Sequence, residues 1–188
     1  AEEVKNENSI PVPVTAYGCS KLVAEKIHGT WQAQDQKSRR LIILRPGVVF
    51  GAGERGNVSR LVKAVLNGYF VFMGNRATRK AGIYVKELCC ALTWVLNDKS
   101  APGAVLFNMS MDPGPTIGDY VRTVQEIAGV NSRVFGVPFI FVYIASHIVD
   151  PILRLLRVSD SFHPTRVLKL IRSNNIEPLW LREQGYKY

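Results

Sequence analysis

The sequence predicts an α/β fold in which helices and strands alternate along the chain. A continuous aliphatic run at 41–44 is typical of a buried strand, whereas the amphipathic spacing over 57–67 is typical of a helix. Segments of both kinds follow in turn toward the C-terminus, without an internal repeat or a low-complexity stretch. With 47% hydrophobic residues among 188, the chain is long and apolar enough to form a core.

The expected elements follow a polar lead-in at 1–13. In order, they are a helix at 17–34, a strand at 41–44 extended by 48–50, a helix at 57–67 closed by Gly68, a strand at 69–73, a helix at 85–96, a strand at 104–108 and a turn at 111–115. Thr116 then opens another helix, because Asp119 three residues later completes a capping-box pattern.

The apolar stretch 134–149 leaves two interpretations open. Its sixteen residues fall short of the roughly 20 that a helix needs to span a bilayer, which favours a helix of the core or of a substrate-binding domain. Phe139, Phe141 and Tyr143 near basic residues also suit an interfacial membrane helix. His147 is expected to be a packed or rim histidine rather than a metal ligand, and no metal site is expected.

Charge and cysteine usage indicate the class of partner and the compartment. The net charge of +9 indicates anionic partners, but the basic residues are scattered and follow no nucleic-acid-binding motif, so no nucleic acid partner is expected. Three cysteines without Cys-x-x-Cys spacing indicate reduced thiols and a cytoplasmic protein. Cys89 and Cys90 lie in an apolar helical run and are expected to be buried. The start of the chain is polar and does not read as a signal peptide.

The strongest chemical signal is the pair Tyr17 and Lys21. Four residues apart on a helix, the two side chains lie on one face, one turn apart. An ammonium beside a phenol favours the phenolate, so Tyr17 is a candidate proton acceptor or donor for a hydroxyl that loses a hydride. With seven tyrosines and ten lysines in the chain, the spacing alone is also compatible with an ordinary solvated contact.

The neighbours of this pair decide between the two interpretations. Gly18 and Ser20 lie inside the pair, Thr15-Ala16 precede it, and Arg45-Pro46-Gly47 begins twenty-four residues after Lys21. With these motifs the chain resembles the extended short-chain dehydrogenase/reductase family, the NAD-dependent epimerases and dehydratases, from about Val14 to Asn97 and more loosely to the C-terminus.

The resemblance implies a fold and a division of roles. The fold would be the C-terminal part of an extended Rossmann-type (SDR) α/β fold with a small, mostly helical substrate-binding subdomain. Residues 1–110 would form the catalytic half and 111–188, interleaved with 51–85, the substrate-binding part. The nucleotide-binding half would lie upstream of these residues, so we expect the chain by itself to bind NAD weakly and to be inactive alone.

The resemblance also implies a set of site residues. Tyr17 and Lys21 would be catalytic. Cofactor binding would fall to Tyr17, Lys21, Pro46, Gly47 and Val48. Substrate binding would fall to Asn57, Val58, Val71, Met73, Lys80 and Arg166. The plainer alternatives are that Asn57 only caps its helix, that Lys80 belongs to a solvated basic loop, and that Arg166 is surface charge.

The implied activity is that of an NAD-dependent epimerase or dehydratase acting on a nucleoside-diphosphate sugar, with a UDP-sugar 4-epimerase as first choice and NADP as an alternative cofactor. A homodimer in the full-length protein and a cytoplasmic location go with it. The alternatives are a hydroxysteroid-type dehydrogenase, which the apolar 134–149 would suit, and a catalytically incomplete fragment or partner subunit.

A second motif imitates a nucleotide-binding fingerprint. Gly51-Ala52-Gly53-Glu54-Arg55-Gly56 matches Gly-x-Gly-x-x-Gly between a strand and a helix. No acidic residue lies about twenty positions later to hold a ribose hydroxyl, since Glu87 is the first acid after Glu54. Pro46 also interrupts the preceding strand, where a central first strand needs a backbone donor. We therefore expect a loop on the substrate side, with Arg55 and Asn57 at a helix start that favours anions.

Overall fold

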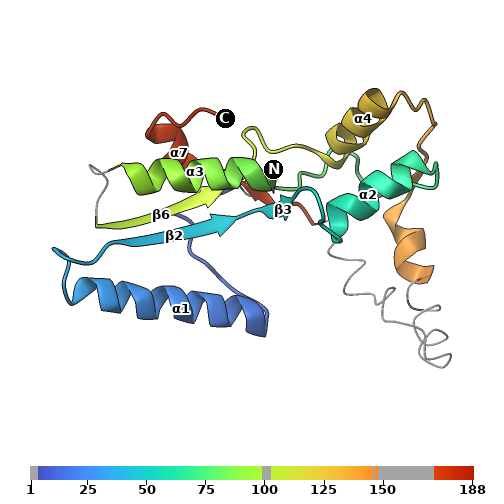
Figure 1. The fold of residues 1–188 in the computed structure, drawn as a ribbon. Helices are drawn as coiled ribbons and strands as arrows, with labels where there is room; N and C mark the ends of the chain where they lie inside the picture. Colours follow the sequence, from blue (N-terminus) through green and yellow to red (C-terminus); the bar gives the residue numbers. More distant parts are fainter. Residues whose placement is uncertain (1–3, 99–102, 146, 148–171) are drawn as a thin grey trace. The chain divides into compact units, whose positions relative to one another are not determined.

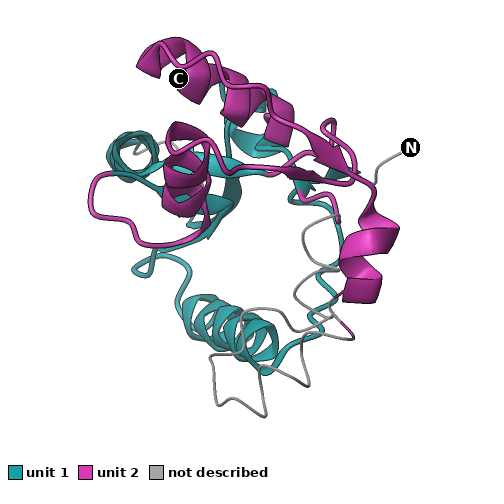
Figure 2. Ribbon diagram, turned by 90° about the vertical axis from the view of Figure 1, so that its right-hand side faces the viewer, with its two compact units in different colours: residues 1–51, 81–114, 175–188 teal, residues 52–80, 115–174 magenta. Residues whose placement is uncertain are grey.

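The computed structural model describes residues 4–98, 103–145, 147 and 172–188 (Figure 1). The helices and strands of these residues include β1 (Val4–Lys5), α1 (Ala16–Ala33), β2 (Leu41–Pro46), β3 (Val48–Phe50), α2 (Asn57–Leu66), β4 (Phe72–Met73), β5 (Gly82–Tyr84), α3 (Val85–Asn97), β6 (Ala104–Met109), α4 (Ile117–Ala128), β7 (Gly136–Val137), β8 (Asn175–Ile176) and α7 (Leu179–Glu183). The chain divides into two compact units, unit 1 with residues 1–51, 81–114 and 175–188, and unit 2 with 52–80 and 115–174 (Figure 2).

Unit 1 is built around two parallel strands. β2 and β6 pair in register from Leu41 with Ala104 to Pro46 with Met109. Figure 1 shows α1 along one face of this pair and α3 along the other. Parallel neighbours need a long crossover between them, and α3 supplies the part that packs back on the strands. The result is the alternating α/β arrangement that the sequence predicts.

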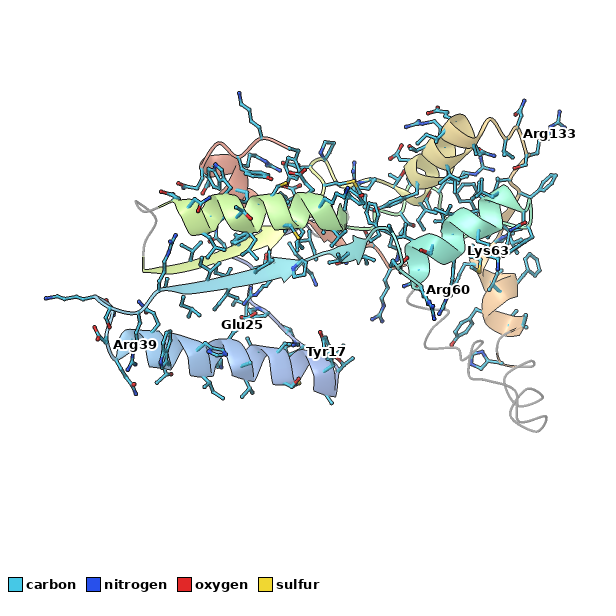
Figure 3. The ribbon with its side chains drawn as sticks, viewed as in Figure 1. Tyr17, Glu25, Arg39, Arg60, Lys63 and Arg133 are labelled. Atoms are coloured by element: carbon cyan, nitrogen blue, oxygen red, sulfur yellow. The ribbon has the colours of Figure 1, made fainter. Side chains whose placement is uncertain are left out.

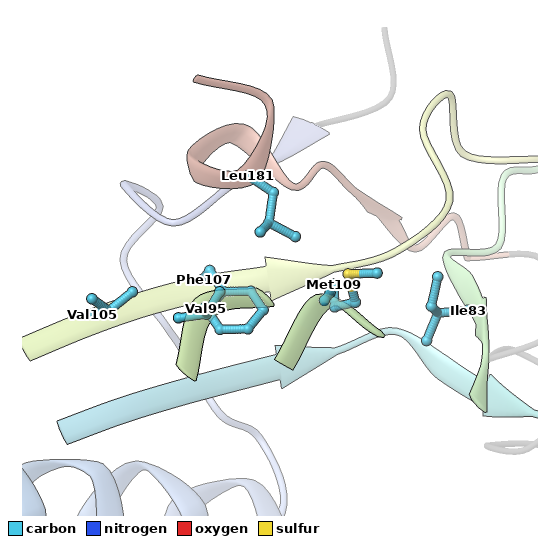
Figure 4. Packing of buried hydrophobic residues seen from close by; sticks show 7 residues of the cluster. Ile83, Val95, Val105, Phe107, Met109 and Leu181 are labelled. Carbon is cyan, nitrogen blue, oxygen red and sulfur yellow. The ribbon is translucent and has the colours of Figure 1, made fainter. Parts of the chain in front are cut away.

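The core of unit 1 lies between α3, β6 and the C-terminal segment. Its buried members are Ile83, Ala91, Val95, Val105, Phe107, Met109 and Leu181 (Figure 4). Leu181 of α7 is fully buried, and the ring of Trp180 lies 5.8 Å from that of Phe107. The Tyr186 hydroxyl donates to Glu87 Oε1 at 2.6 Å, which fixes the end of the chain against α3.

One carboxylate joins the two ends of unit 1. Glu7 Oε1 accepts the backbone N–H of Asn108 at 2.8 Å, and Glu7 Oε2 accepts that of Leu179 at 3.1 Å. The same segment forms β1, which pairs in parallel with β8. A single acidic side chain thereby satisfies donors from both β6 and the start of α7, which would otherwise lack partners.

Gly47 is the point where the sheet forks. Its N–H donates to Met109 O at 2.8 Å, at the end of β6, while the next residue, Val48, donates to Ala81 O at 2.9 Å. β3 then pairs with β5 instead of β6. A Cβ on Gly47 would lie 2.8 Å from Ala81 O and 2.9 Å from Ala81 C, so a side chain does not fit between the two backbones.

Unit 2 packs α2 against α4. Val65, Phe72 and Val121 are its buried core, and Leu61, Phe70, Ile117, Val124 and Val134 pack around them. The capping box at α4 is confirmed: Thr116 accepts from the Asp119 N–H, and Asp119 accepts from the Thr116 N–H. The helix ends at Gly129, whose φ of 64° is one that glycine adopts without strain.

Three expectations need correction. The strand predicted at 69–73 is shorter, because the N–H groups of Tyr69 and Phe70 both donate to Ala64 O and close α2. The stretch 134–149 opens with β7 rather than a helix, becomes helical at 139–145, and its last residues lie outside the described part. Cys89 and Cys90 are exposed rather than buried, since the inner face of α3 follows the spacing of Ala91 and Val95.

The other predicted elements are confirmed within a few residues: α1, β2 with β3, α2, α3 and β6. Among the residues that the structure describes, no helix combines the length and the apolar character needed to cross a membrane.

We expect Gly47→Ala to lower the free energy of unfolding of unit 1 by about 1–3 kcal/mol, because the added methyl group overpacks a backbone contact. All three tryptophans, Trp31, Trp94 and Trp180, lie in unit 1, so urea unfolding followed by tryptophan fluorescence reports on it.

The matched control is Gly29→Ala in α1, where a Cβ would meet nothing within 4 Å. This change should stabilise unit 1 by about 0.5–1 kcal/mol, since alanine is the better helix former. Equal stability of the Gly47→Ala and Gly29→Ala variants would contradict the fork at Gly47.

Candidate functional site

The first two turns of α1 carry Tyr17 and Lys21 on one face. Thr15 caps the helix by accepting the Gly18 N–H at 3.1 Å through its hydroxyl, which fixes where the helix begins. Lys21 Nζ lies 5.5 Å from the centre of the Tyr17 ring, within the range of a cation–π contact. Tyr17 is 72% exposed, so its hydroxyl is open to a ligand.

The same face of α1 carries Glu25 one turn further on. Glu25 accepts from Arg45 Nε at 2.9 Å, and its second oxygen contacts Arg45 Nη2, so the pair is bidentate. The two side chains are 21% and 26% exposed, respectively. The hydrogen bond to Glu25 raises the pKa of Arg45, which keeps the guanidinium charged. Figure 3 labels Tyr17 near the start of the helix and Glu25 on the side toward β2.

Sequence reasoning missed Glu25, although a signal was present. Tyr17, Lys21 and Glu25 follow one another at intervals of four, which places all three on one helical face. Arg45 immediately precedes Pro46, so the ion pair ties the Tyr17–Lys21 face of α1 to the carboxyl end of β2. In a Tyr17–Lys21 site this pair would position the helix rather than contact a reactant.

The cofactor-binding candidates lie where that strand ends. Pro46 closes β2, Gly47 is the fork, and Val48 opens β3. Pro46 and Val48 are exposed, and ligands in open α/β sheets bind outside the carboxyl ends of the strands, where neighbouring strands diverge. Within unit 1 the residues expected to hold a nicotinamide cofactor thus lie at the carboxyl end of a strand, where such ligands bind in open α/β sheets.

The substrate-binding candidates Asn57 and Val58 form the first turn of α2. The cap of that helix is Gly56, so the alternative that Asn57 is the cap is wrong. Glu54 instead reaches into the turn: its Oε2 accepts the Ser59 N–H at 2.9 Å, and the Ser59 hydroxyl also donates to it. These bonds, led by the one from the Ser59 hydroxyl, lower the pKa of Glu54.

The start of α2 therefore already holds an anion supplied by the chain. This agrees with the expected preference of that turn for negative charge. It also means that the Glu54 carboxylate already occupies one backbone donor, the Ser59 N–H, that a phosphate could otherwise use. Gly53, with φ of 83°, gives the loop the bend that brings Glu54 back to Ser59.

The remaining candidates lie on other elements of unit 2. Val71 is exposed just before β4, and Met73 ends that strand. Lys80 is half-buried, and its ammonium donates to Arg172 O at 2.5 Å in a bond that is exposed to solvent. Arg166 lies outside the described residues. In the described part of the chain, no three His, Cys, Asp or Glu side chains gather as metal ligands.

Both a family model and a curated protein match the sequence of this chain. A sequence model of the NAD dependent epimerase/dehydratase family matches residues 1–109. The chain is 24% identical over 181 residues to N-acetyl-alpha-D-glucosaminyl-diphospho-ditrans,octacis-undecaprenol 4-epimerase of Escherichia coli O157:H7, covering 96% of this chain and 54% of that protein.

Two solved structures share the fold. UDP-glucose 4-epimerase of Thermotoga maritima with UDP-glucose matches at a TM-score of 0.62 and 19% identity, over 97% of this chain and 52% of that one. UDP-glucuronic acid 4-epimerase of Bacillus cereus in complex with NAD matches at 0.60 and 20%, over 73% and 45%. The fold is that of part of a Rossmann-type epimerase, and the chain spans about half the length of the relatives it matches.

A double-mutant cycle tests the positioning pair. Glu25→Gln and Arg45→Gln should show a coupling energy of about 0.5–3 kcal/mol in the unfolding of unit 1, because each side chain loses its partner when the other is changed. Tryptophan fluorescence during urea unfolding measures it.

The control cycle combines Glu25→Gln with Lys37→Gln, an exposed residue beyond the C-terminus of α1. Its coupling should stay within about 0.5 kcal/mol of zero, as for separate sites. Indistinguishable coupling in the two cycles would rule out the ion pair as a specific link.

Carbon-13 NMR titration tests the carboxylate at α2. Ser59→Ala should raise the pKa of Glu54 toward its ordinary value, because the serine hydroxyl is the main cause of its depression. The pKa of Glu54 is lower in the folded than in the unfolded protein. The stabilisation from its contacts is therefore fully present above the unfolded-state pKa, and it is lost as the pH falls through the folded-state pKa.

Ser38→Ala is the matched control. Ser38 donates to Asp35 in the same way, and this contact is the main cause of the lowered pKa of Asp35. The control should raise the pKa of Asp35 and leave Glu54 unchanged. A Glu54 pKa that does not respond to Ser59→Ala would show that the carboxylate is not held at the helix start.

Proposed function

Since the chain belongs to the NAD dependent epimerase/dehydratase family, we propose that it carries the catalytic pair and substrate-binding residues of an NAD-dependent epimerase that inverts C4 of a sugar linked to a diphosphate, a UDP sugar in the first instance. In this proposal residues 1–110 hold the catalytic half, and 111–188 with 51–85 bind substrate. A cytoplasmic homodimer completes it, and the free thiols of Cys19, Cys89 and Cys90 support a reducing compartment.

The observation that carries the proposal is the Tyr17–Lys21 pair. The Tyr17 phenolate oxygen takes the proton from the sugar hydroxyl at the carbon that is oxidised, and the resulting phenol returns it when that carbon is reduced. Lys21, 5.5 Å from the ring, stabilises the negative charge that the phenolate oxygen carries before it takes the proton. The Glu25–Arg45 pair holds this face of α1 at the strand end where the reaction would take place.

The cofactor would be NAD, with NADP as an alternative. When bound, it supplies the acceptor and then the donor of a hydride. Tyr17, Lys21, Pro46, Gly47 and Val48 would hold it, the first two by side chains and the other three by the backbone at the end of β2. The named relative of Bacillus cereus is described in complex with NAD, which supports this choice.

The substrate would be held by its diphosphate, leaving the sugar free to turn between the two hydride transfers. Asn57, Val58 and Lys80 supply donors and positive charge near phosphate, and Val71 and Met73 supply apolar surface for a base. Arg166 would add a guanidinium. The named relatives carry the sugar on UDP or on diphospho-undecaprenol, so the diphosphate-linked sugar is the chemistry they share.

Turnover measurements test this function. In the full-length protein with NAD added, C4 epimers of a UDP sugar should interconvert, and Tyr17→Phe should lower kcat by about 10²–10⁴-fold, because it removes the proton-transfer group alone. Tyr69→Phe, which removes the hydroxyl of another exposed tyrosine, should leave kcat unchanged.

Parallel assays with a UDP sugar and with a polyprenyl-diphosphate sugar identify which carrier is used. Turnover of either supports the diphosphate-linked class. Turnover of a steroid alcohol, with none of these sugars, would instead establish the hydroxysteroid-type dehydrogenase and overturn the epimerase.

A further inference from the structure

Almost all of the chain's net charge belongs to unit 2. Thirteen of the 24 Lys and Arg residues and five of the 15 Asp and Glu residues fall in its ranges, which gives +8. The other eleven basic and ten acidic residues give unit 1 only +1. Catalysis by the Tyr17–Lys21 pair in unit 1 does not explain this concentration of charge.

Unit 2 also exposes large apolar side chains along one continuous segment. Phe135, Ile140, Phe141 and Ile144 are between 51% and 70% exposed. The last three share one side of the helical turns at 139–145, because they are spaced i, i+1 and i+4. We call Phe135, Ile140, Phe141 and Ile144 the apolar patch.

Arginines flank this patch. Arg133 is exposed two residues before Phe135, and Arg76 Nη2 donates to Val134 O at 3.1 Å, which brings its guanidinium beside the same segment. The chain around Phe135 is itself held in place, since Phe135 O accepts the Phe72 N–H at 2.9 Å at the start of the β4–β7 pair. Figure 3 labels Arg133 together with Arg60 and Lys63, two exposed cations one turn apart on α2.

We propose that unit 2 docks on an anionic lipid bilayer, with the apolar patch inserted at the headgroup level and the flanking arginines on lipid phosphates. Peripheral membrane elements combine exposed aromatic and aliphatic side chains with basic residues in this way. Each cation near such a surface adds attraction that salt screens. The proposal goes beyond the epimerase function and does not depend on it.

The makeup of the patch favours lipid over nucleic acid. Single-stranded nucleic acid is bound by stacking bases on aromatic rings, and double-stranded by cations on phosphates. Ile140 and Ile144 contribute to neither kind of contact, whereas aliphatic side chains gain from burial among acyl chains. Two exposed isoleucines on one helical side, next to a surplus of arginine, thus point to a membrane surface.

Vesicle co-sedimentation of the full chain tests the proposal. It should bind vesicles of phosphatidylcholine mixed with phosphatidylglycerol, and binding should fall steeply with added salt and be weak on phosphatidylcholine alone. Ile140→Ser/Ile144→Ser should weaken binding about tenfold or more through lost apolar insertion. Arg76→Gln/Arg133→Gln should weaken it and flatten its salt dependence.

The control is Ile10→Ser/Val12→Ser, which removes two even more exposed apolar side chains from nearly neutral unit 1 and should leave binding unchanged. Circular dichroism confirms that each variant is folded. Absence of binding to the anionic vesicles, or equal loss in the control, would overturn the proposal. So would binding to a DNA duplex that depends on the arginines and not on the isoleucines, without vesicle binding. Failure of the epimerase assay leaves these outcomes untouched, because they require neither NAD nor sugar.

Discussion

The contact on which unit 1 depends is the close approach of two backbones at Gly47 and Ala81. It allows β2 to leave β6 and the chain to continue as β3 beside β5. Without that fork, β2 and β3 would form one continuous strand. Pro46 and Val48 would then lie inside this strand and not at the carboxyl end of β2. The geometry of the proposed active site is thus set by a residue that has no side chain.

Much of this could be predicted from the sequence, because the relevant signals are local. The four-residue spacing on a helix predicted that Tyr17 and Lys21 lie on one face. The capping-box pattern of Thr116 and Asp119 predicted where α4 begins. Exposure of Cys89 and Cys90 was missed because hydrophobicity alone does not say which side of α3 faces the core. The reach of Glu54 to Ser59 depends on the bend at Gly53, and the hold of Lys80 on Arg172 joins positions far apart in sequence. Neither contact could be predicted from the spacing of residues along the sequence.

The two units divide the physical tasks. Unit 1 uses bidentate, partly buried contacts, such as Glu25 with Arg45 and Glu7 with two backbone donors, that fix side chains and termini in place. In the described part of unit 2 most cations are exposed, and Glu54 supplies an anion within the chain. The proposed catalytic face and the proposed surface for phosphates make different demands, which match this distribution of charge.

The fully buried position of Leu181 bears on how the chain folds as it is synthesised. β2 and β6 emerge from the ribosome well before Leu181, yet the core that covers Phe107 is incomplete without α7. The polypeptide of unit 2 is translated in between, so it can become compact while unit 1 still exposes apolar surface. Until α7 has been made, unit 1 cannot cover this apolar surface, and a premature stop shortly before α7 would leave the surface permanently open to aggregation.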